Sequence, residues 1–319
     1  MNTIEQHFQE ILQGKEPANL YDPISYILMQ PGKRLRPQLV RIAADMFNGD
    51  AEQAGHIAAA FEMLHNFTLI HDDIMDKADV RRGQPTVYKK WDGNTAILAG
   101  DALAVMAMQQ LLKLQCDPLT ILDLIGIFGQ TALEVCEGQQ FDLDFETMKN
   151  VSIDQYLNMI RLKTSVMFAG CLKAGGRFAN ADGESLQSLY DLGIHLGIAF
   201  QLADDLLDVY ADEEVFGKAV GGDIKDNKKT FLLIKALELA DETQRQQLLG
   251  LFSTQGADEK EKFQQVKSIF DAVNVKQATE EEIARYTERC MDDIRRIRTS
   301  EDKKAFVLDL VHRLQSRNK

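Results

Sequence analysis

The chain has 319 residues, of which 45% are hydrophobic and 27% charged, so it can bury a substantial core as one large domain or two. Its 36 basic and 49 acidic side chains give a net charge of −13, which argues against nucleic acid as a partner. The four cysteines show no C-x-x-C spacing, so we expect reduced, mostly buried thiols in a cytoplasmic protein.

Long segments of helical periodicity and only six prolines predict an all-α protein. We expect one helical domain over residues 1–319, with helices over 55–76 and 297–319. The expected helix breaks are too short for domain linkers and lie at residues 30–37, 81–86, 116–118, 173–183 and 216–227. Strongly apolar stretches such as 95–112 are interrupted by Asp101, so we expect no membrane insertion.

The first chemically suggestive stretch is PGKRLRP, residues 31–37. It places Lys33, Arg34 and Arg36 after a Pro-Gly break and before a helical segment. The amide groups and dipole of a helix start favour an anion, and basic side chains strengthen that preference.

The helix expected over 55–76 ends in HDDIMD, where Asp72 and Asp76 lie one helical turn apart. On one helix face such carboxylates repel each other, unless they share a hard cation such as Mg²⁺. Asp73 is rotated by about 100° from Asp72 and belongs to a supporting position or to solvent. His65, seven residues before Asp72, lies near the same face, where a core or capping histidine is an equally good reading.

Basic residues follow this cluster, and the same arrangement occurs again later in the chain. Arg81 and Arg82 follow the first cluster, and arginine forks recognise phosphate oxygens. ADDLLD at 203–208 repeats the Asp spacing with Asp204, Asp205 and Asp208. The lysines after it are Lys218, Lys225, Lys228 and Lys229. A single cluster is more often a solvated helix end, but two clusters in apolar surroundings indicate a diphosphate site neutralised by metal, Lys and Arg.

Five motifs occur in the order found in trans-isoprenyl diphosphate synthases, the polyprenyl synthetase family. They are GKRLRP, HDDIMD with RRGQPT, LKTS at 162–165, FQLADDLLD and GKAVGGDIKDNKKT, and they extend over roughly residues 25–235. The family often has EGK where this chain has DNK at 226–228, with Lys228 in register. The resemblance implies a helical bundle around a central cavity, usually in a homodimer.

The resemblance also implies roles for individual residues. Three Mg²⁺ ions on an allylic diphosphate would be held by Asp72, Asp76 and Asp204, with Asp73, Asp205 and Asp208 as supporting carboxylates. The allylic diphosphate would also be bound by Arg81, Lys163, Lys218 and Lys228. Isopentenyl diphosphate would be bound by Lys33, Arg36, His65 and Arg82. Thr164 and Gln201 resemble the polar groups beside the developing allylic cation.

Product length is expected to depend on Phe67, the fifth residue before the first Asp, and on the small Thr68 that follows it. Helical geometry turns Phe67 away from the Asp72 face, so this role rests on the resemblance. Phe61 lies on the Asp72 face and is expected to limit a longer product. A short-chain synthase making a C15 or C20 product is therefore expected, with C20 favoured.

Three other readings remain open. A class I terpene cyclase typically pairs one Asp-rich motif with an Asn/Ser/Glu-type motif and needs no isopentenyl diphosphate site. A non-catalytic helical partner subunit usually lacks one Asp motif, whereas this chain has both. An acidic helical metal-binding protein would bind metal without any dependence on diphosphate.

Overall fold

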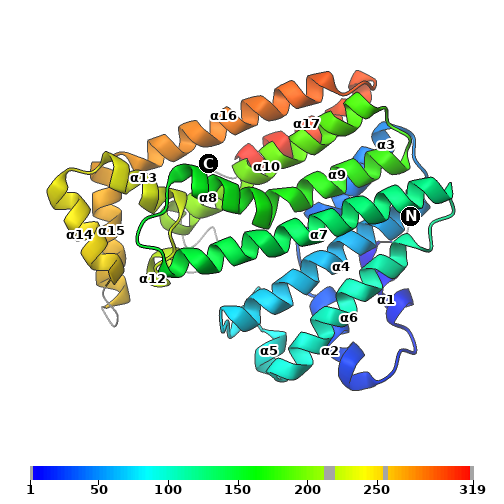
Figure 1. The fold of residues 1–319 in the computed structure, drawn as a ribbon, viewed down its shortest axis with the longest axis horizontal. Coiled ribbons are helices and arrows are strands. Elements are labelled where there is room, and N and C mark those ends of the chain that lie inside the picture. The colour runs from blue at the N-terminus through cyan, green and yellow to red at the C-terminus, as the bar shows by residue number, and fades with distance from the viewer. Residues whose placement is uncertain (1–2, 212–219, 254–257, 317–319) are drawn as a thin grey trace. The chain divides into compact units, whose positions relative to one another are not determined.

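The computed structural model describes residues 3–211, 220–253 and 258–316. Within them the chain is helical apart from one short antiparallel hairpin, β1 (Val80–Arg81) and β2 (Gln84–Pro85) (Figure 1). The all-α prediction is confirmed.

The chain forms two compact units. The first comprises Met1–Ala132, Met167–Tyr190 and Arg296–Lys304, and the second comprises Leu133–Val166, Asp191–Arg295 and Ala305–Lys319.

The first unit is built around one long helix, α4 (Ala51–Met75), which packs against α3 (Leu35–Met46) and α6 (Gly93–Leu111). Its other elements are α1 (Ile4–Leu12), α2 (Ala18–Leu28), α5 (Val87–Lys90), and parts of α7 (Pro118–Thr147), α9 (Val166–Phe178) and α10 (Gly183–Tyr210). Phe8, Phe61 and Phe168 are fully buried here. Because α4 is buried on several sides, polar residues along it need partners.

The ends of α4 are set by aspartates. The Asp50 carboxylate accepts hydrogen bonds from the amides of Glu52 and Gln53, as an N-cap residue does. At the other end, Asp76 is the C-cap and Lys77 adopts a left-handed conformation with φ of 53°. The observed helix agrees with the prediction of 55–76 to within four residues.

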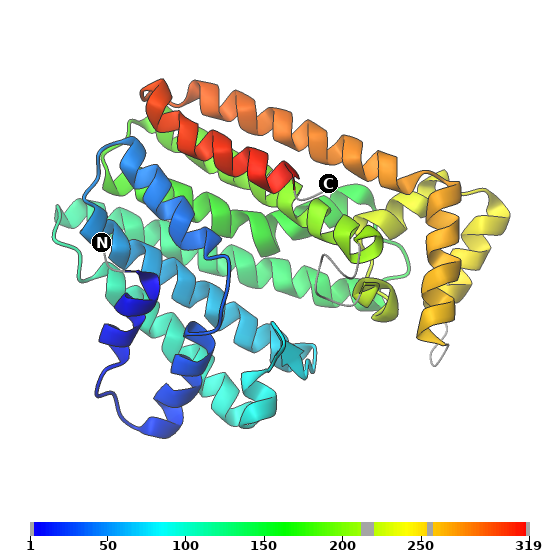
Figure 2. The ribbon, with the colours of Figure 1, turned by 180° about the vertical axis from the view of Figure 1, so that it is seen from behind.

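The second unit has a hydrophobic core formed by α10, α13 and α16 with their neighbours. Its elements are α8 (Ile153–Ile160), a π-helical turn η1 (Arg161–Ser165), α12 (Gly222–Lys225), α13 (Phe231–Leu239), α14 (Glu242–Ser253), α15 (Glu259–Ala272), α16 (Val275–Arg296), and most of α17 (Glu301–Ser316), with the remaining parts of α7 and α10. In Figure 2, α16 runs alongside α10. The two helices are joined by His195 Nδ1 and Asp293 Oδ2, 2.6 Å apart.

Most predicted helix breaks are confirmed, and one is misplaced. The break at 173–183 is wrong at its start, because α9 continues to Phe178. Gly175 allows close packing there: a Cβ on it would lie 2.3 Å from the Val40 carbonyl oxygen of α3. The last helix begins at Glu301 instead of residue 297. The break at 216–227 lies partly outside the described residues.

One described helix, α7, is long and apolar enough to cross a membrane by length and composition alone. Its most apolar 18-residue window has a mean hydropathy of 1.5, and 28% of that window is buried. The stretch at 95–112, from which we argued against membrane insertion, belongs to a different helix, α6.

Candidate active site

The first carboxylate cluster lies at the C-terminal end of α4. Asp72 is half-buried, Asp76 is exposed, and the Asp76 amide donates to the Asp72 carbonyl oxygen at 2.8 Å. Asp76 has helical backbone angles, so the two carboxylates leave the same side of the helix, as the spacing predicts. Asp72 and Asp76 can therefore approach one ligand together.

Asp73 has a different environment from its neighbours. Its side chain is 1% exposed and accepts a hydrogen bond from Arg81 Nε at 2.7 Å. Burial raises the pKa of the Asp73 carboxyl, and Arg81 opposes that rise. Arg81 stands on β1, and the turn that follows has Arg82 and Gly83 at φ of 53° and 74°. Two consecutive positive φ angles are typical of a tight type I′ hairpin, which holds Arg81 against Asp73.

Arg36 and Arg82, two of the residues expected to bind substrate, lie near a third, His65 of α4. Burial, with the nearby charges of Arg36 and Arg82, holds the pKa of His65 well below its ordinary value. Its imidazole is therefore neutral at neutral pH and can offer one donor and one acceptor. The Arg36 guanidinium lies over the Phe168 ring at 5.1 Å, and Lys33 is exposed on the adjoining loop.

Phe67 and Thr68 lie one turn before the first carboxylate cluster. The Phe67 ring is half-buried and meets the His71 ring edge to face, with centroids 4.7 Å apart. The Thr68 hydroxyl donates to the His65 carbonyl oxygen at 2.8 Å. Phe61 is fully buried against Phe128, with ring centroids 5.7 Å apart.

The second carboxylate cluster lies near the end of α10 and contains a chain of hydrogen bonds. The Thr164 hydroxyl donates to Gln201 Oε1 at 3.1 Å, and Gln201 Nε2 donates to Asp205 Oδ1 at 3.0 Å. The Tyr156 hydroxyl donates to the other oxygen of Asp205. Asp204, the next residue back along α10, is half-buried. This series of hydrogen bonds fixes the Asp205 carboxylate and connects it to Gln201 and Thr164, the two residues expected beside the allylic cation.

Asp208 organises the glycine loop that follows in this unit. Its carboxylate accepts hydrogen bonds from the amides of Gly222 at 3.2 Å and Asp223 at 3.0 Å. Burial, reinforced by Asp205 and Asp208, raises the pKa of Asp223 to about 8. Burial also raises the pKa of Asp205 to about 6, and Asp208 adds to that rise. Burial and mutual repulsion therefore disfavour the ionised form of these carboxyls, and a cation beside them would favour it.

Lys163 stands in the π-helical turn η1, and its ammonium group lies 2.5 Å from Asp142 Oδ2 on α7. Single π turns occur frequently at functional sites. Glycines pack against this turn: a Cβ on Gly138 would lie 2.2 Å from the Lys163 amide nitrogen, and one on Gly197 would lie 2.4 Å from Ser165 Cα. Lys163 is therefore placed by close backbone packing as well as by an ion pair.

Lys228 and Lys218 are the remaining predicted ligands. The Lys228 amide donates to the Asp223 carbonyl oxygen at 2.9 Å, and its exposed side chain is close enough to oppose the raised pKa of Asp223 and Asp208. Lys218 lies outside the described residues.

Sequence reasoning missed the partners of the charged groups, namely Glu62, Asp142, Tyr156 and Asp223. Only Asp223 had a sequence signal, since it lies within the GKAVGGDIKDNKKT motif. The others pair with residues at least 21 positions away in sequence, so no local pattern reveals them.

Among the described side chains, no three His, Cys, Asp or Glu residues lie close enough to enclose a metal ion. Asp72 and Asp76 belong to the first unit and Asp204 to the second. Mg²⁺ commonly takes only one or two carboxylates and completes its shell with water and phosphate oxygens. Asp72 and Asp76 on α4, and the carboxylate cluster on α10, each fit that manner of binding.

Comparison with known proteins decides the family. The polyprenyl synthetase family model matches residues 17–270. The chain belongs to the polyprenyl synthetase family. A geranylgeranyl diphosphate synthase of Methanosarcina mazei is 41% identical over 235 residues, covering 74% of this chain and 72% of the relative. A geranylfarnesyl diphosphate synthase of Natronomonas pharaonis is 34% identical over 249 residues, covering 73% of each.

Solved structures of the family agree with this fold. A geranylgeranyl pyrophosphate synthase superposes with a TM-score of 0.93 at 42% identity, covering 99% of both chains. A polyprenyl synthase from Caulobacter crescentus, complexed with calcium and isoprenyl diphosphate, has a TM-score of 0.86 at 26% identity and covers 99% of this chain and 94% of that one. The chain is an isoprenyl diphosphate synthase, a prenyltransferase of a family that typically uses divalent metal ions.

Proposed function

We propose that this synthase is a short-chain trans-prenyltransferase that extends allylic diphosphates with isopentenyl diphosphate and makes mainly the C20 product, geranylgeranyl diphosphate. The observation that supports it most is the pair of Asp clusters with identical spacing on α4 and α10, each beside basic residues. Similarity to relatives named geranylgeranyl and geranylfarnesyl diphosphate synthase supports a short product.

In this proposal Asp72, Asp76 and Asp204 hold Mg²⁺, three ions in all, together with the allylic diphosphate. When bound, the ions supply positive charge to the leaving diphosphate. Arg81 and Lys163, each held by a carboxylate, and Lys228 add donors around that diphosphate, and Lys218 does so by resemblance. Fixed donors of this kind act where charge develops, as electrostatic catalysis requires.

The chain's own groups also explain what happens at the allylic carbon. Thr164 and Gln201 present oxygen atoms, already connected by a hydrogen bond, that stabilise positive charge without attacking it. The allylic C–O bond breaks and releases diphosphate, the double bond of isopentenyl diphosphate attacks the resulting cation, and one proton is lost. No general base is evident among the side chains of the site that the structure describes, and we assign this proton to the released diphosphate.

Isopentenyl diphosphate is assigned to the basic cluster of Arg36, His65 and Arg82 with Lys33. The neutral His65 adds a hydrogen-bond donor without extra charge, because burial among arginines lowers the pKa of its imidazole. This cluster also disfavours a class I terpene cyclase, which has no second diphosphate to bind. Both Asp clusters disfavour a non-catalytic partner subunit.

We also propose a cytoplasmic homodimer of single-domain chains. The family model runs through both compact units, from residue 17 to 270, which supports one domain.

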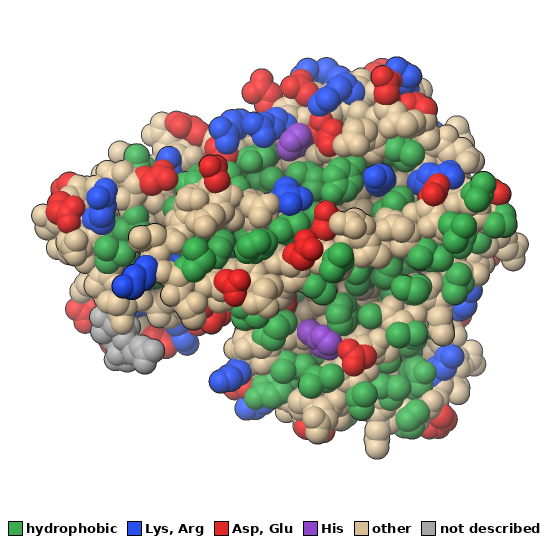
Figure 3. Space-filling model, viewed as in Figure 1, with side chains coloured by type: hydrophobic (Ala, Val, Ile, Leu, Met, Phe, Trp, Pro, Cys, Tyr) green, Lys and Arg blue, Asp and Glu red, His purple; other side chains and the backbone are tan. Residues whose placement is uncertain are grey.

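The α6–α7 face of the first unit exposes large apolar side chains, and Figure 3 shows hydrophobic side chains gathered over both helices. This face is formed by Ile97, Leu98, Val105, Met108, Leu112, Leu119 and Leu122. An exposed patch of this kind marks a protein contact, and a second copy covers it without insertion in a membrane.

The decisive experiment incubates the purified chain with Mg²⁺, isopentenyl diphosphate and C5, C10 or C15 allylic primers, and then measures product length. We expect condensation with a dominant C20 product. A dominant C15 or C25 product would replace C20 as the product length. Absence of condensation with every primer would reject the proposed synthase activity.

The metal assignment is tested by Asp72→Ala and Asp204→Ala. Each change removes a proposed ligand, so we expect turnover to fall by roughly 10²-fold or more at unchanged thermal stability. Glu288→Ala, an exposed change on α16, is the control and should leave turnover unchanged. Normal turnover in both Asp variants would show that these carboxylates hold no essential metal.

A further inference from the structure

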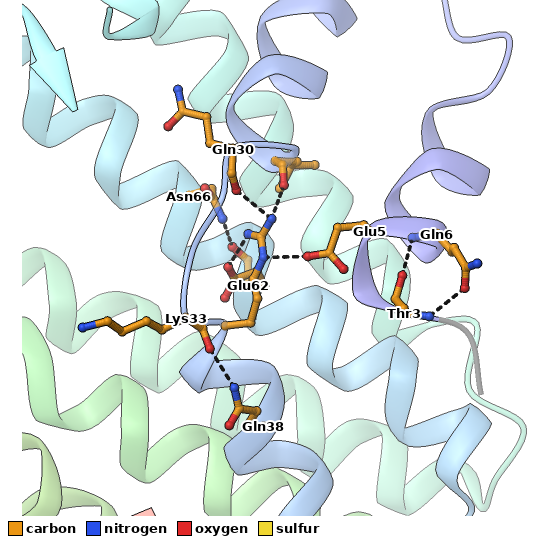
Figure 4. Close-up of polar contacts among 10 residues, drawn as sticks. Thr3, Glu5, Gln6, Gln30, Lys33, Gln38, Glu62 and Asn66 are labelled. Carbon is orange, nitrogen blue, oxygen red and sulfur yellow. Dashed lines mark hydrogen bonds and ion pairs between the residues drawn. The ribbon is translucent and has the colours of Figure 1, made fainter. Parts of the chain in front are cut away.

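Arg34 lies between two proposed isopentenyl diphosphate ligands, Lys33 and Arg36, yet its guanidinium is occupied within the protein. Nη1 donates to Glu62 Oε1 at 2.8 Å, and Nε donates to Glu5 Oε1 at 3.0 Å (Figure 4). Nη2 donates to two carbonyl oxygens, those of Leu28 at 2.6 Å and Gln30 at 3.0 Å. A guanidinium has five N–H donors. With four of them satisfied by protein oxygens, Arg34 has little capacity left for a substrate phosphate.

The backbone of Arg34 is also unusual. It adopts the left-handed region, with φ of 49° and ψ of 41°, directly before α3 begins at Leu35. A residue with a Cβ adopts this conformation only where its surroundings hold it there. Here the two bonds from Nη2, one to Leu28 at the end of α2 and one to Gln30 in the loop that follows, clamp the loop. In Figure 4 the Lys33 side chain points away from the Arg34 ion pairs. The left-handed conformation of Arg34 turns the backbone between Lys33 and the start of α3.

Glu62 is the buried counter-charge of this arrangement. Its side chain is 3% exposed, and Oε2 makes no hydrogen bond. Glu62 lies one turn before His65 on α4. It is also close enough to Arg82 for its negative charge to favour the charged form of that arginine. A buried carboxylate is costly without a partner, so Glu62 and Arg34 depend on each other.

Glu5 extends the arrangement to the N-terminal helix. It lies in the first turn of α1, whose start is fixed by a capping box between Thr3 and Gln6 (Figure 4). The Glu5 side chain is 40% exposed, compared with 10% for Arg34. A more exposed ion pair contributes less, so Glu5 reinforces the clamp and Glu62 is its main support.

We infer that Arg34 and Glu62 are positioning residues of the isopentenyl diphosphate site: their buried ion pair holds the loop that presents Lys33 and Arg36, and Glu5 strengthens it from α1. This inference rests on the proposed assignment of isopentenyl diphosphate to Lys33, Arg36, His65 and Arg82. In this proposal Arg34 makes no contact with substrate, although it lies within the PGKRLRP motif.

The test uses Arg34→Lys and Glu62→Gln in the full-length enzyme. Lysine keeps the charge but cannot make four bonds in this fork geometry, and glutamine keeps the shape but loses the charge. Because small displacements of binding groups cost up to about 10²-fold, we expect the KM for isopentenyl diphosphate to rise about tenfold or more in each variant. The KM for the allylic primer and the product length should stay at wild-type values. Glu5→Gln should give a smaller rise, about twofold.

Controls separate positioning from stability. Arg177→Lys alters another Arg–carboxylate pair of the first unit, with Asp123, and should change neither KM. The double variant Arg34→Met with Glu62→Met replaces the ion pair by apolar side chains, a change that often preserves folding. We expect it to melt near the wild-type temperature and still to show the raised KM for isopentenyl diphosphate.

Three results would overturn the inference: an unchanged KM in Arg34→Lys, an equal rise of both KM values, or a wild-type KM in the folded double variant. If the wild-type enzyme condenses no primer, the proposed function fails before this test begins. If it condenses primers and the variants behave like wild type, only the positioning role fails.

Discussion

Phe67 stands beside the site on α4, with its ring held against His71. We predict that Phe67→Ala lengthens the product by one or more C5 units, because we propose that this ring limits the path of the growing chain. Product sizes from the C15 primer measure the effect. Phe306→Ala is the control, since Phe306 is a well-exposed phenylalanine of the second unit. The same distribution in Phe67→Ala and wild type would remove Phe67 as a limit on chain length.

Charged residues at short spacing were predictable, and the groups that hold them were not. The positions of Asp72, Asp76 and Asp204 follow from the repeated spacing of the two clusters. The hydrogen bond of Tyr156 to Asp205 joins residues 49 positions apart, so it depends on how α8 packs on α10. A local pattern contains no trace of such a pair, because partner choice is fixed only by tertiary packing.

The π-helical turn η1 depends on a glycine in a neighbouring helix. A Cβ on Gly138 of α7 would lie 2.2 Å from the Lys163 amide nitrogen, a backbone atom that cannot move aside alone. We predict that Gly138→Ala destabilises the protein by about 1–3 kcal/mol and lowers turnover, since the turn must shift and take Lys163 with it. Thermal unfolding and turnover together measure the effect.

Gly129→Ala is the matched control, in the same helix, where a new Cβ meets nothing within 4 Å. There the change should stabilise the protein by about 0.5–1 kcal/mol, because alanine favours a helix interior more than glycine does. Equal effects of both substitutions would contradict the packing account of Gly138.

Helices as elements were largely predictable from apolar periodicity, and the misplaced break at 173–183 has a physical cause. Gly175 and Gly176 suggested a helix end, but they allow α9 to approach its neighbours closely. A glycine in a sequence marks either a break or a close contact, and only the packed structure distinguishes the two.

At the scale of the whole molecule, the α6–α7 face predicts the assembly. Leu98 and Val105 lie two turns apart on α6 and are 60% and 61% exposed. We predict that Leu98→Glu with Val105→Glu converts dimers to monomers, since charges in a buried apolar contact cost roughly 2 kcal/mol or more each. Sedimentation velocity measures the mass. Leu239→Glu, at an exposed leucine outside this face, should keep the wild-type mass. A monomeric wild-type protein would reject the homodimer.

The π-helical turn has one more consequence, for the phase of the helix that contains it. A π turn contains one residue more than an α-helical turn, so the apolar stripe of α8 and that of α9 are out of step across residues 161–165. Deleting a single residue there would restore regular periodicity and would make the segment look more helical in sequence. It would also rotate Lys163 by about 100° relative to one of its flanking helices. The π turn therefore helps to set the direction of the Lys163 side chain. A sequence redesigned for regular helix propensity would remove the π turn and change that direction.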